Sequence, residues 1–178
     1  YYGHTKAETV LGKALTELQR ESFLLSTKVG RYGAGGVNTW DYSAGRTRES
    51  VFESMERLHV DYIDLINVHD IEFADLSQAL VELREKGLVG HVGITDLQLE
   101  NLKWVIDHVP EGTVESVLNF CHYTLNDDKL VDFLDYFEEK GVGVINASPF
   151  AMGLLSQRGV PEWHPAPAAL VEACRKAS

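Results

Sequence analysis

The chain has 178 residues, of which 44% are hydrophobic and 24% charged, values typical of one soluble globular domain. The 16 Lys and Arg against 27 Asp and Glu give a formal net charge of -11, which argues against nucleic acid or an anionic membrane surface as a partner. No window approaches ~18 consecutive apolar residues, so no membrane span is predicted. Cys121 and Cys174 lack the spacing of a zinc or disulfide motif, which favours a reducing, cytoplasmic location.

The hydrophobic spacing first predicts a helix over 6–20, a short strand over 22–28 and a loop over 31–45. Ser43 then caps a helix that carries Val51, Met55 and Leu58, and a strand follows over 62–69. The alternation continues with helices over 76–86, 97–108 and 127–140, and with strands over 88–95, 114–120 and 142–148. A Gly- and Pro-bearing loop from 149 to 167 leads to a final helix over 168–177.

This alternation predicts an α/β fold with a parallel sheet, because parallel neighbours need a long crossover. No G-x-G-x-x-G run follows a strand, which disfavours a doubly wound dinucleotide fold. Polar side chains instead end one strand after another, as at the rim of a (β/α)8 TIM barrel. They are Lys28, His69, Thr95 with Asp96, Asn119, and Asn146 with Ser148.

Five predicted strands cannot close an eight-stranded barrel, which typically needs about 250 residues. Residues 1–178 are therefore predicted to be one partial barrel domain with about five of eight strands, lacking the first strands and the C-terminal units. The opening Tyr1-Tyr2-Gly3 without an initiator Met agrees with missing upstream sequence. Expressed alone, such a piece is expected to associate through its two unpaired sheet edges.

Tyr2, Lys28 and His69 together suggest general acid–base chemistry. A phenol with a pKa near ~10 is a poor acid or base at neutral pH unless a cation stabilises its phenolate. Lys28 supplies that cation, and His69 is placed to orient a carbonyl or to share the proton. Each of the three residues alone is more simply explained as a structural or solvated group. Their occurrence together at successive rim positions is what favours an active site.

A metal site is the alternative chemistry, since His69, Asp70 and Glu72 lie close together and His122 is a further possible ligand. The carboxylates are adjacent in a loop and point in different directions, and nothing fixes a third ligand. We therefore favour a solvated loop for Asp70 and Glu72, and predict no metal.

Several segments resemble the aldo-keto reductase family, and more narrowly its L-galactose dehydrogenase-like branch. The resemblance spans nearly the whole chain. Its segments are YYG, STKVGRY, ERLHVDYIDLINVHDIEF, VGITDLQLE, LNFCHY, GVGVINASPFAMGLLS and PEWHPA.

The resemblance implies a tetrad of Asp, Tyr, Lys and His around a nicotinamide. On this chain Tyr2 matches the tyrosine, Lys28 the lysine and His69 the histidine, while the aspartate is expected a few residues before Tyr1. The partner of Lys28 would then be missing here.

For the cofactor, NAD or NADP, the resemblance assigns Thr95, Asp96 and Asn119 to the carboxamide and Ser148 to the pyrophosphate. Asp96 departs from the asparagine of many relatives and can only accept a hydrogen bond. Ala147 stands where many relatives stack an aromatic ring on the nicotinamide, so stacking is expected from elsewhere or lost.

The activity implied is oxidation of the anomeric carbon of an aldose such as L-galactose to the lactone. The partner is then a small-molecule sugar, and Gly33 to Trp40 are candidates for the sugar pocket, with Trp40 as the stacking surface. A general aldo-keto reductase acting on other carbonyls is the alternative enzyme. A truncated, non-catalytic member that only binds the cofactor is the alternative of another class, and the sequence does not indicate an oligomeric state.

Overall fold

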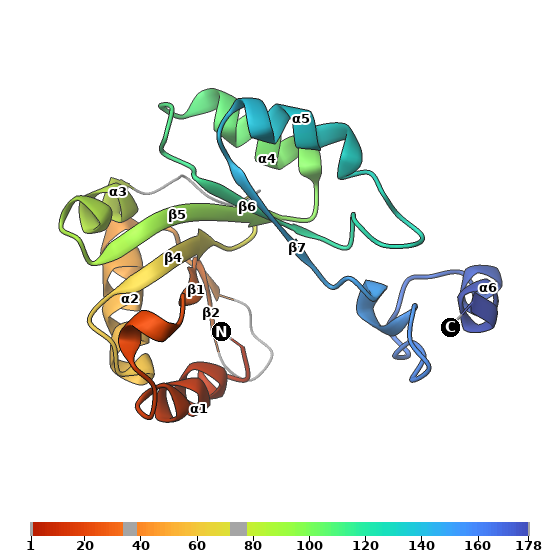
Figure 1. Ribbon diagram of the computed structural model, residues 1–178, viewed down its shortest axis with the longest axis horizontal. Coiled ribbons are helices and arrows are strands. Elements are labelled where there is room, and N and C mark those ends of the chain that lie inside the picture. Colours follow the sequence, from red (N-terminus) through yellow and green to blue (C-terminus); the bar gives the residue numbers. More distant parts are fainter. Residues whose placement is uncertain (1, 34–38, 72–77, 178) are drawn as a thin grey trace.

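The computed structural model describes residues 2–33, 39–71 and 78–177 (Figure 1). A five-stranded parallel sheet runs through its centre in the order β1-β4-β5-β6-β7. Its strands are β1 (Ser26–Val29), β4 (Ile63–Val68), β5 (Val89–Asp96), β6 (Ser116–Phe120) and β7 (Gly143–Ala147). The predicted α/β fold with five parallel strands is confirmed.

Helices connect successive strands and cover one face of the sheet. In Figure 1, α1 (Lys6–Leu15), α2 (Ala44–Leu58) and α3 (Gln78–Glu85) lie beside β1, β4 and β5, whereas α4 (Leu99–His108) and α5 (Val131–Glu139) lie beside β5, β6 and β7. After β7 the chain leaves the sheet through the 3-10 turn η3 (Ala151–Gly153) and ends in α6 (Ala168–Ala177), set apart from the other helices (Figure 1). None of the helices in the described part of the chain has the length and apolar character that a bilayer crossing requires.

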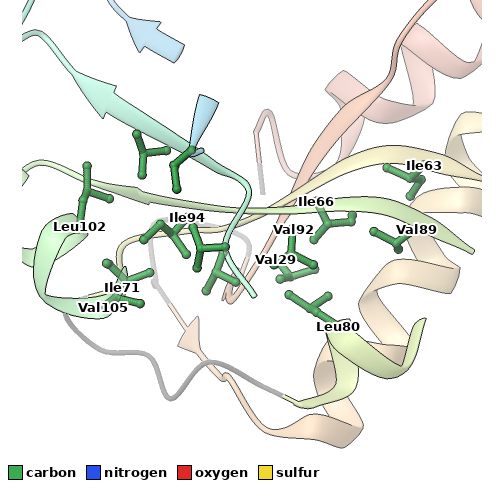
Figure 2. Packing of buried hydrophobic residues seen from close by; sticks show 14 of the residues in the cluster. Val29, Ile63, Ile66, Ile71, Leu80, Val89, Val92, Ile94, Leu102 and Val105 are labelled. Atoms are coloured by element: carbon green, nitrogen blue, oxygen red, sulfur yellow. The ribbon is translucent and has the colours of Figure 1, made fainter. Parts of the chain in front are cut away.

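The main core lies between the helices and one face of the sheet. Alternate residues of each strand point to opposite faces, so Ile66 of β4, Val92 of β5 and Val117 of β6 are fully buried against the helices. Figure 2 shows Ile66 and Val92 packed with Leu80 of α3, and Ile94 near Leu102 of α4. The opposite face carries Lys28, Asn67 and Thr95, together with apolar residues of β6 and β7.

The first predicted helix and strand are shorter than their hydrophobic pattern suggests. The helix ends at Leu15, and the chain passes through the 3-10 turn η1 (Arg20–Ser22) before β1 begins at Ser26. The intervening backbone is held by side chains: Arg20 donates to the carbonyl of Phe23 at 3.0 Å, and Leu25 N–H donates to the carboxylate of Asp64 at 2.8 Å. Because these bonds replace ladder bonds, the strand starts late.

Two further differences lie in loops. The predicted helix over 127–140 begins only at Val131, because Thr124 and Asp127 form a local turn in which Asp127 N–H donates to the Thr124 hydroxyl at 3.2 Å. The predicted loop over 31–45 contains a short antiparallel pair, β2 (Arg31–Tyr32) with β3 (Thr39–Trp40).

Candidate active site at the carboxyl end of the sheet

The three side chains predicted to act together meet at the carboxyl end of the sheet. The hydroxyl of Tyr2 lies 3.1 Å from Nε2 of His69, and Nζ of Lys28 lies 5.0 Å from the centroid of the Tyr2 ring. Lys28 belongs to β1, and His69 follows directly after β4, whose parallel pairing with β1 brings the two residues to the same rim. His69 is buried and Tyr2 is half exposed, so the pair borders solvent on one side only.

Lys28 sits in a partly desolvated position. Burial lowers the pKa of its ammonium below the ordinary value, and the nearby charge of Asp70 opposes part of that lowering. A carboxylate therefore does face Lys28 in the described part of the chain, although it comes from Asp70 and not from a residue that precedes Tyr2.

Asp70 is held in an unusual backbone conformation at the end of β4. Its φ of 53° lies in the left-handed region, which Asp tolerates better than most residues. Its N–H donates to the hydroxyl of Thr95 at 3.2 Å, and its carbonyl oxygen lies 3.0 Å from the hydroxyl of Tyr42. Asp70 is thus fixed from β5 on one side and from the segment before α2 on the other.

Tyr42 holds the two residues that follow β4 through hydrogen bonds. Its hydroxyl donates at 2.7 Å to the carbonyl of His69 and shares its proton with the carbonyl of Asp70. Burial raises the pKa of the Tyr42 hydroxyl far above its ordinary value, and the Asp70 charge adds to the effect, so this group stays a donor. The ring lies where a Cβ on Gly30 would come within 2.3 Å, and Gly30 itself has a φ of +100°, so both space and backbone require glycine there.

Trp40, the predicted sugar-stacking residue, lies above this rim. Its ring is 6.2 Å from that of Tyr42, nearly parallel to it, and 6.0 Å from the ring of His69. The guanidinium of Arg31 lies 5.0 Å from the centroid of the Trp40 ring. Residues 34–38 of the predicted sugar loop lie outside the described residues.

A cavity of about 500 Å³ opens beside these groups. One wall is polar and carries the predicted catalytic residues, and the other is apolar and comes from β6 and β7. Its lining residues are Tyr2, Lys28, Arg31, His69, Asp70, Thr95, Asp96, Leu97, Leu118, Phe120 and Ala147.

The structure brings Thr95 and Asp96 to the cavity. Thr95 Oγ1 accepts the N–H of Asp70, which leaves its own hydroxyl proton to be donated. Asp96 has a second task, because its Oδ1 accepts the N–H of Gln98 at 2.8 Å just before α4. Asp96 therefore lines the cavity as a residue, while its carboxylate supports the start of that helix.

Asn119 and Ser148 are not among the cavity-lining residues. Asn119 is fully buried; its Nδ2 donates to the carbonyl of Ile145 at 3.3 Å, and its Oδ1 accepts the N–H of His122 at 3.2 Å. In the register of β5 with β6, Leu118 pairs with Thr95, so Leu118 lies on the cavity side. Ser148 has a φ of 59°, and its Oγ accepts the N–H of Met152 at 3.0 Å.

The metal alternative receives no added support. Within the described ranges, no group of three His, Cys, Asp or Glu side chains could hold a metal ion, and Glu72 lies outside those ranges. His122, the proposed fourth ligand, is engaged elsewhere: its Nδ1 lies 3.0 Å from Asp127 and its Nε2 lies 2.8 Å from the carbonyl of Leu97.

The model of the Aldo/keto reductase family matches residues 1–176. The chain belongs to this family. Among solved structures, the holo form of an aldo-keto reductase from Bacillus halodurans is similar to it with a TM-score of 0.74 and 29% sequence identity, over 90% of this chain and 54% of that one. The five strands are accordingly part of the aldo-keto reductase fold, as predicted.

Two curated relatives are sugar dehydrogenases by name. L-galactose dehydrogenase of Arabidopsis thaliana is 48% identical over 99% of this chain, and D-arabinose 1-dehydrogenase of Saccharomyces cerevisiae is 34% identical over 100% of it. The chain spans 57% of the length of each.

The cavity of this aldo-keto reductase chain fits the nicotinamide that the family uses. A nicotinamide ring needs an apolar contact for its face, and Leu118, Phe120 and Ala147 provide one. Its carboxamide needs polar partners, and Thr95, which lines the cavity, has a hydroxyl proton to donate. Phe120 of the neighbouring strand brings an aromatic ring to the cavity, where the position of Ala147 offers none. Because Phe120 ends a strand as an ordinary apolar residue, its place beside the cavity was not predictable from the sequence.

Proposed function

We propose that the protein carrying this chain is an NAD- or NADP-dependent aldose 1-dehydrogenase that oxidises the anomeric carbon of a sugar such as L-galactose to the lactone. The observation that carries the proposal is the contact of the Tyr2 hydroxyl with His69 at 3.1 Å, with Lys28 5.0 Å from the Tyr2 ring, beside a cavity of about 500 Å³. The identities of 48% and 34% to two sugar dehydrogenases support the substrate class.

Each residue has a defined task in this reaction. Tyr2, as phenolate, takes the proton of the sugar hydroxyl, and the ammonium of Lys28 stabilises the phenolate charge. His69 holds the hydroxyl of Tyr2 and the sugar oxygen in line. The nicotinamide, when bound, accepts the hydride from C1 of the sugar.

The remaining residues are assigned to the cofactor and the sugar by their place relative to the cavity. Thr95 and Asp96 hold the carboxamide of the nicotinamide. The turn that begins at Ser148 approaches the pyrophosphate. Asn119 is left out of the proposal because its amide is already bonded on both sides. Trp40 offers its ring to the apolar face of the sugar.

We further propose that residues 1–178 are part of one (β/α)8 barrel, in a cytoplasmic protein without a nucleic-acid partner. Two features support this: each of the sheet's parallel strands reaches the same rim, and the net charge is -11.

The test is turnover by the native gene product with a panel of aldoses and both nucleotides. L-galactose with NAD should be oxidised to lactone faster than simple aldehydes are reduced with NADPH. Tyr2→Phe should lower kcat by roughly 10²-fold or more while nucleotide binding persists. Tyr123→Phe, a change at an exposed tyrosine, serves as the control and should leave kcat unchanged.

The alternatives give other results. Preferential reduction of simple aldehydes with NADPH would indicate a general aldo-keto reductase. Nucleotide binding without turnover of any carbonyl or sugar would indicate a non-catalytic member.

A further inference from the structure

His69 has a second contact, on the side of its ring that faces away from Tyr2. Its Nδ1 lies 2.8 Å from Oδ2 of Asp70, and Tyr2 lies 3.1 Å from its Nε2. We propose that Asp70 is a positioning residue that keeps the proton of neutral His69 on Nδ1, so that Nε2 accepts the proton of the Tyr2 hydroxyl. The tautomer stands on this geometry alone, whereas its consequence for the reaction rests on the proposed function.

Charge and distance favour the Nδ1-protonated tautomer of His69. The two atoms are in contact, but the carboxylate oxygen lies off the direction of a ring N–H, so the pair is not a well-aligned hydrogen bond. In the other tautomer the unprotonated, electron-rich Nδ1 would lie 2.8 Å from a carboxylate oxygen, which the negative charge of the oxygen disfavours. A proton on Nδ1 replaces this repulsion with an attraction between the N–H dipole and the carboxylate charge, even though the oxygen lies off the N–H direction.

Asp70 is rigid enough to perform this role. Its N–H is bonded to Thr95 and its carbonyl to Tyr42, and Tyr42 also bonds the carbonyl of His69. The same Oδ2 that contacts His69 lies 3.7 Å from the guanidinium of Arg31. These contacts hold both residues of the pair from three different segments of the chain.

The charged and titratable groups around His69 agree with one carboxylate acting on it directly. Lys28 of β1 and Arg31 of β2 face the same cavity as cations, and Tyr2 faces Nε2. Asp96 of β5 also lines the cavity, but its Oδ1 is bonded at the start of α4. Among the described residues, Asp70 has the carboxylate at contact distance from His69.

The consequence is a direction for the proton. With its O–H directed to Nε2, Tyr2 passes its proton to His69 and so becomes the phenolate that Lys28 stabilises. In sugar oxidation this phenolate takes the proton of the sugar hydroxyl while C1 gives its hydride to the nicotinamide. The imidazolium formed on His69 lies against the Asp70 carboxylate, which stabilises its charge.

The tautomer can be measured without substrate. The native gene product, labelled with ¹⁵N-histidine, is examined by NMR at a pH where His69 is neutral, and His69→Asn assigns the signal. Two variants suit the left-handed backbone at this position: Asp70→Asn retains an acceptor oxygen, and Asp70→Gly removes the side chain. Asp61→Asn removes an exposed charge at the other end of β4 and is the control.

We expect the Nδ1-protonated form in the wild type, Asp70→Asn and Asp61→Asn, and its loss in Asp70→Gly. The kcat for aldose oxidation should fall about tenfold or more in Asp70→Gly, within the range of general acid–base contributions, and less in Asp70→Asn. An Nε2-protonated ring in the wild type, or an unchanged ring in Asp70→Gly, would overturn the proposal. The expected tautomers in a protein that oxidises no aldose would overturn the proposed function and leave the tautomer assignment standing.

Discussion

Lys28 sets the alkaline limit of the proposed reaction. It must carry its proton to stabilise the Tyr2 phenolate, and burial lowers the pKa of its ammonium below 10.5, with Asp70 opposing part of that lowering. In aldose oxidation, kcat/KM should therefore decline at high pH as Lys28 loses its proton, and the decline should set in below pH 10.5. In Lys28→Arg the guanidinium stays charged, so the decline should move to higher pH even if the overall rate falls.

The measurement is kcat/KM of the native gene product between about pH 6 and 11, the interval that brackets ordinary Tyr and Lys titration. Lys129→Arg, at an exposed position that does not line the cavity, is the matched control and should keep the wild-type profile. Identical alkaline declines of kcat/KM in the wild type and Lys28→Arg would show that another group causes the decline.

At the residue scale, strand ends were predictable and loop contacts were not. Lys28, His69 and Thr95 end hydrophobic runs, and parallel strands bring such ends to one rim. The part played by Asp70 depends on a left-handed backbone and on a tyrosine 28 positions earlier, which no local pattern shows.

Asn119 illustrates a different difficulty. Its position at a strand end predicted that Asn119 belongs to the cofactor site. Side chains alternate between the two faces of a strand, however, and the register places Leu118, and not Asn119, beside Thr95 on the cavity side. Register is a property of the paired strands, and a single sequence does not contain it.

At the element scale, the approach of α1 to α2 depends on Gly12. A Cβ at this position would lie 2.1 Å from the carbonyl oxygen of Arg57 and 2.8 Å from Cα of Leu58. Gly12→Ala should therefore push the helices apart and lower the free energy of unfolding by roughly 1–3 kcal/mol, as overpacking does. Gly45→Ala is the control near the start of α2, where nothing lies within 4 Å, and it should be neutral or stabilising by up to about 1 kcal/mol.

Urea unfolding of the two variants and the wild type gives both values. Equal stabilities for Gly12→Ala and the wild type would mean that α1 and α2 can separate without cost, contrary to their close approach at Gly12.

Glu8 ties the same helix to its neighbours. Its carboxylate accepts from the Thr27 hydroxyl of β1 and from Nε of Arg57 of α2, the latter at 2.8 Å. Burial acts to raise the pKa of Glu8, but these hydrogen bonds and the Arg57 charge outweigh it, and the pKa is lowered. A lowered carboxyl pKa contributes stability above the unfolded-state value, and that stability is lost as the pH falls through the folded-state value.

Glu8→Gln should thus lower the free energy of unfolding by about 1 kcal/mol at pH 7, discounted for partial exposure, and by less below about pH 4. Urea unfolding at both pH values measures the difference, with the exposed Glu17→Gln as control. A difference that grew toward acid pH would contradict the sign of the effect.

Element boundaries show where sequence patterns stop being informative. Hydrophobic spacing predicted each helix and strand of the sheet, but Leu18 fits the helical period and lies exposed beyond the end of α1. There Arg20 bonds the backbone of Phe23 and the side chain of Asp64, 44 positions away, and this long-range bond is what delays β1.

At the scale of the whole molecule, the sheet has β1 and β7 at its two edges. Parallel strands at an edge carry N–H and C=O groups that have no ladder partner on the outer side. Along β7 these groups stand next to Val144 and Ile145, which are 36% and 40% exposed. Expressed as these 178 residues alone, the chain should therefore associate as its concentration rises, although its net charge of -11 opposes this.

The residues that carry this association can be identified by placing a charge on the edge. Val144→Lys and Ile145→Lys put a cation on β7 and should shift the onset of association to higher concentration, since an edge lysine is poorly tolerated between paired strands. Leu125→Lys removes an exposed leucine, 92% accessible, from a loop that belongs to no strand, and it changes net charge by the same amount. Light scattering during size-exclusion chromatography gives the mass at each concentration. If Leu125→Lys acted as strongly as the β7 variants, the association would depend on net charge or on general apolar exposure, and the edge of the sheet would not be its cause.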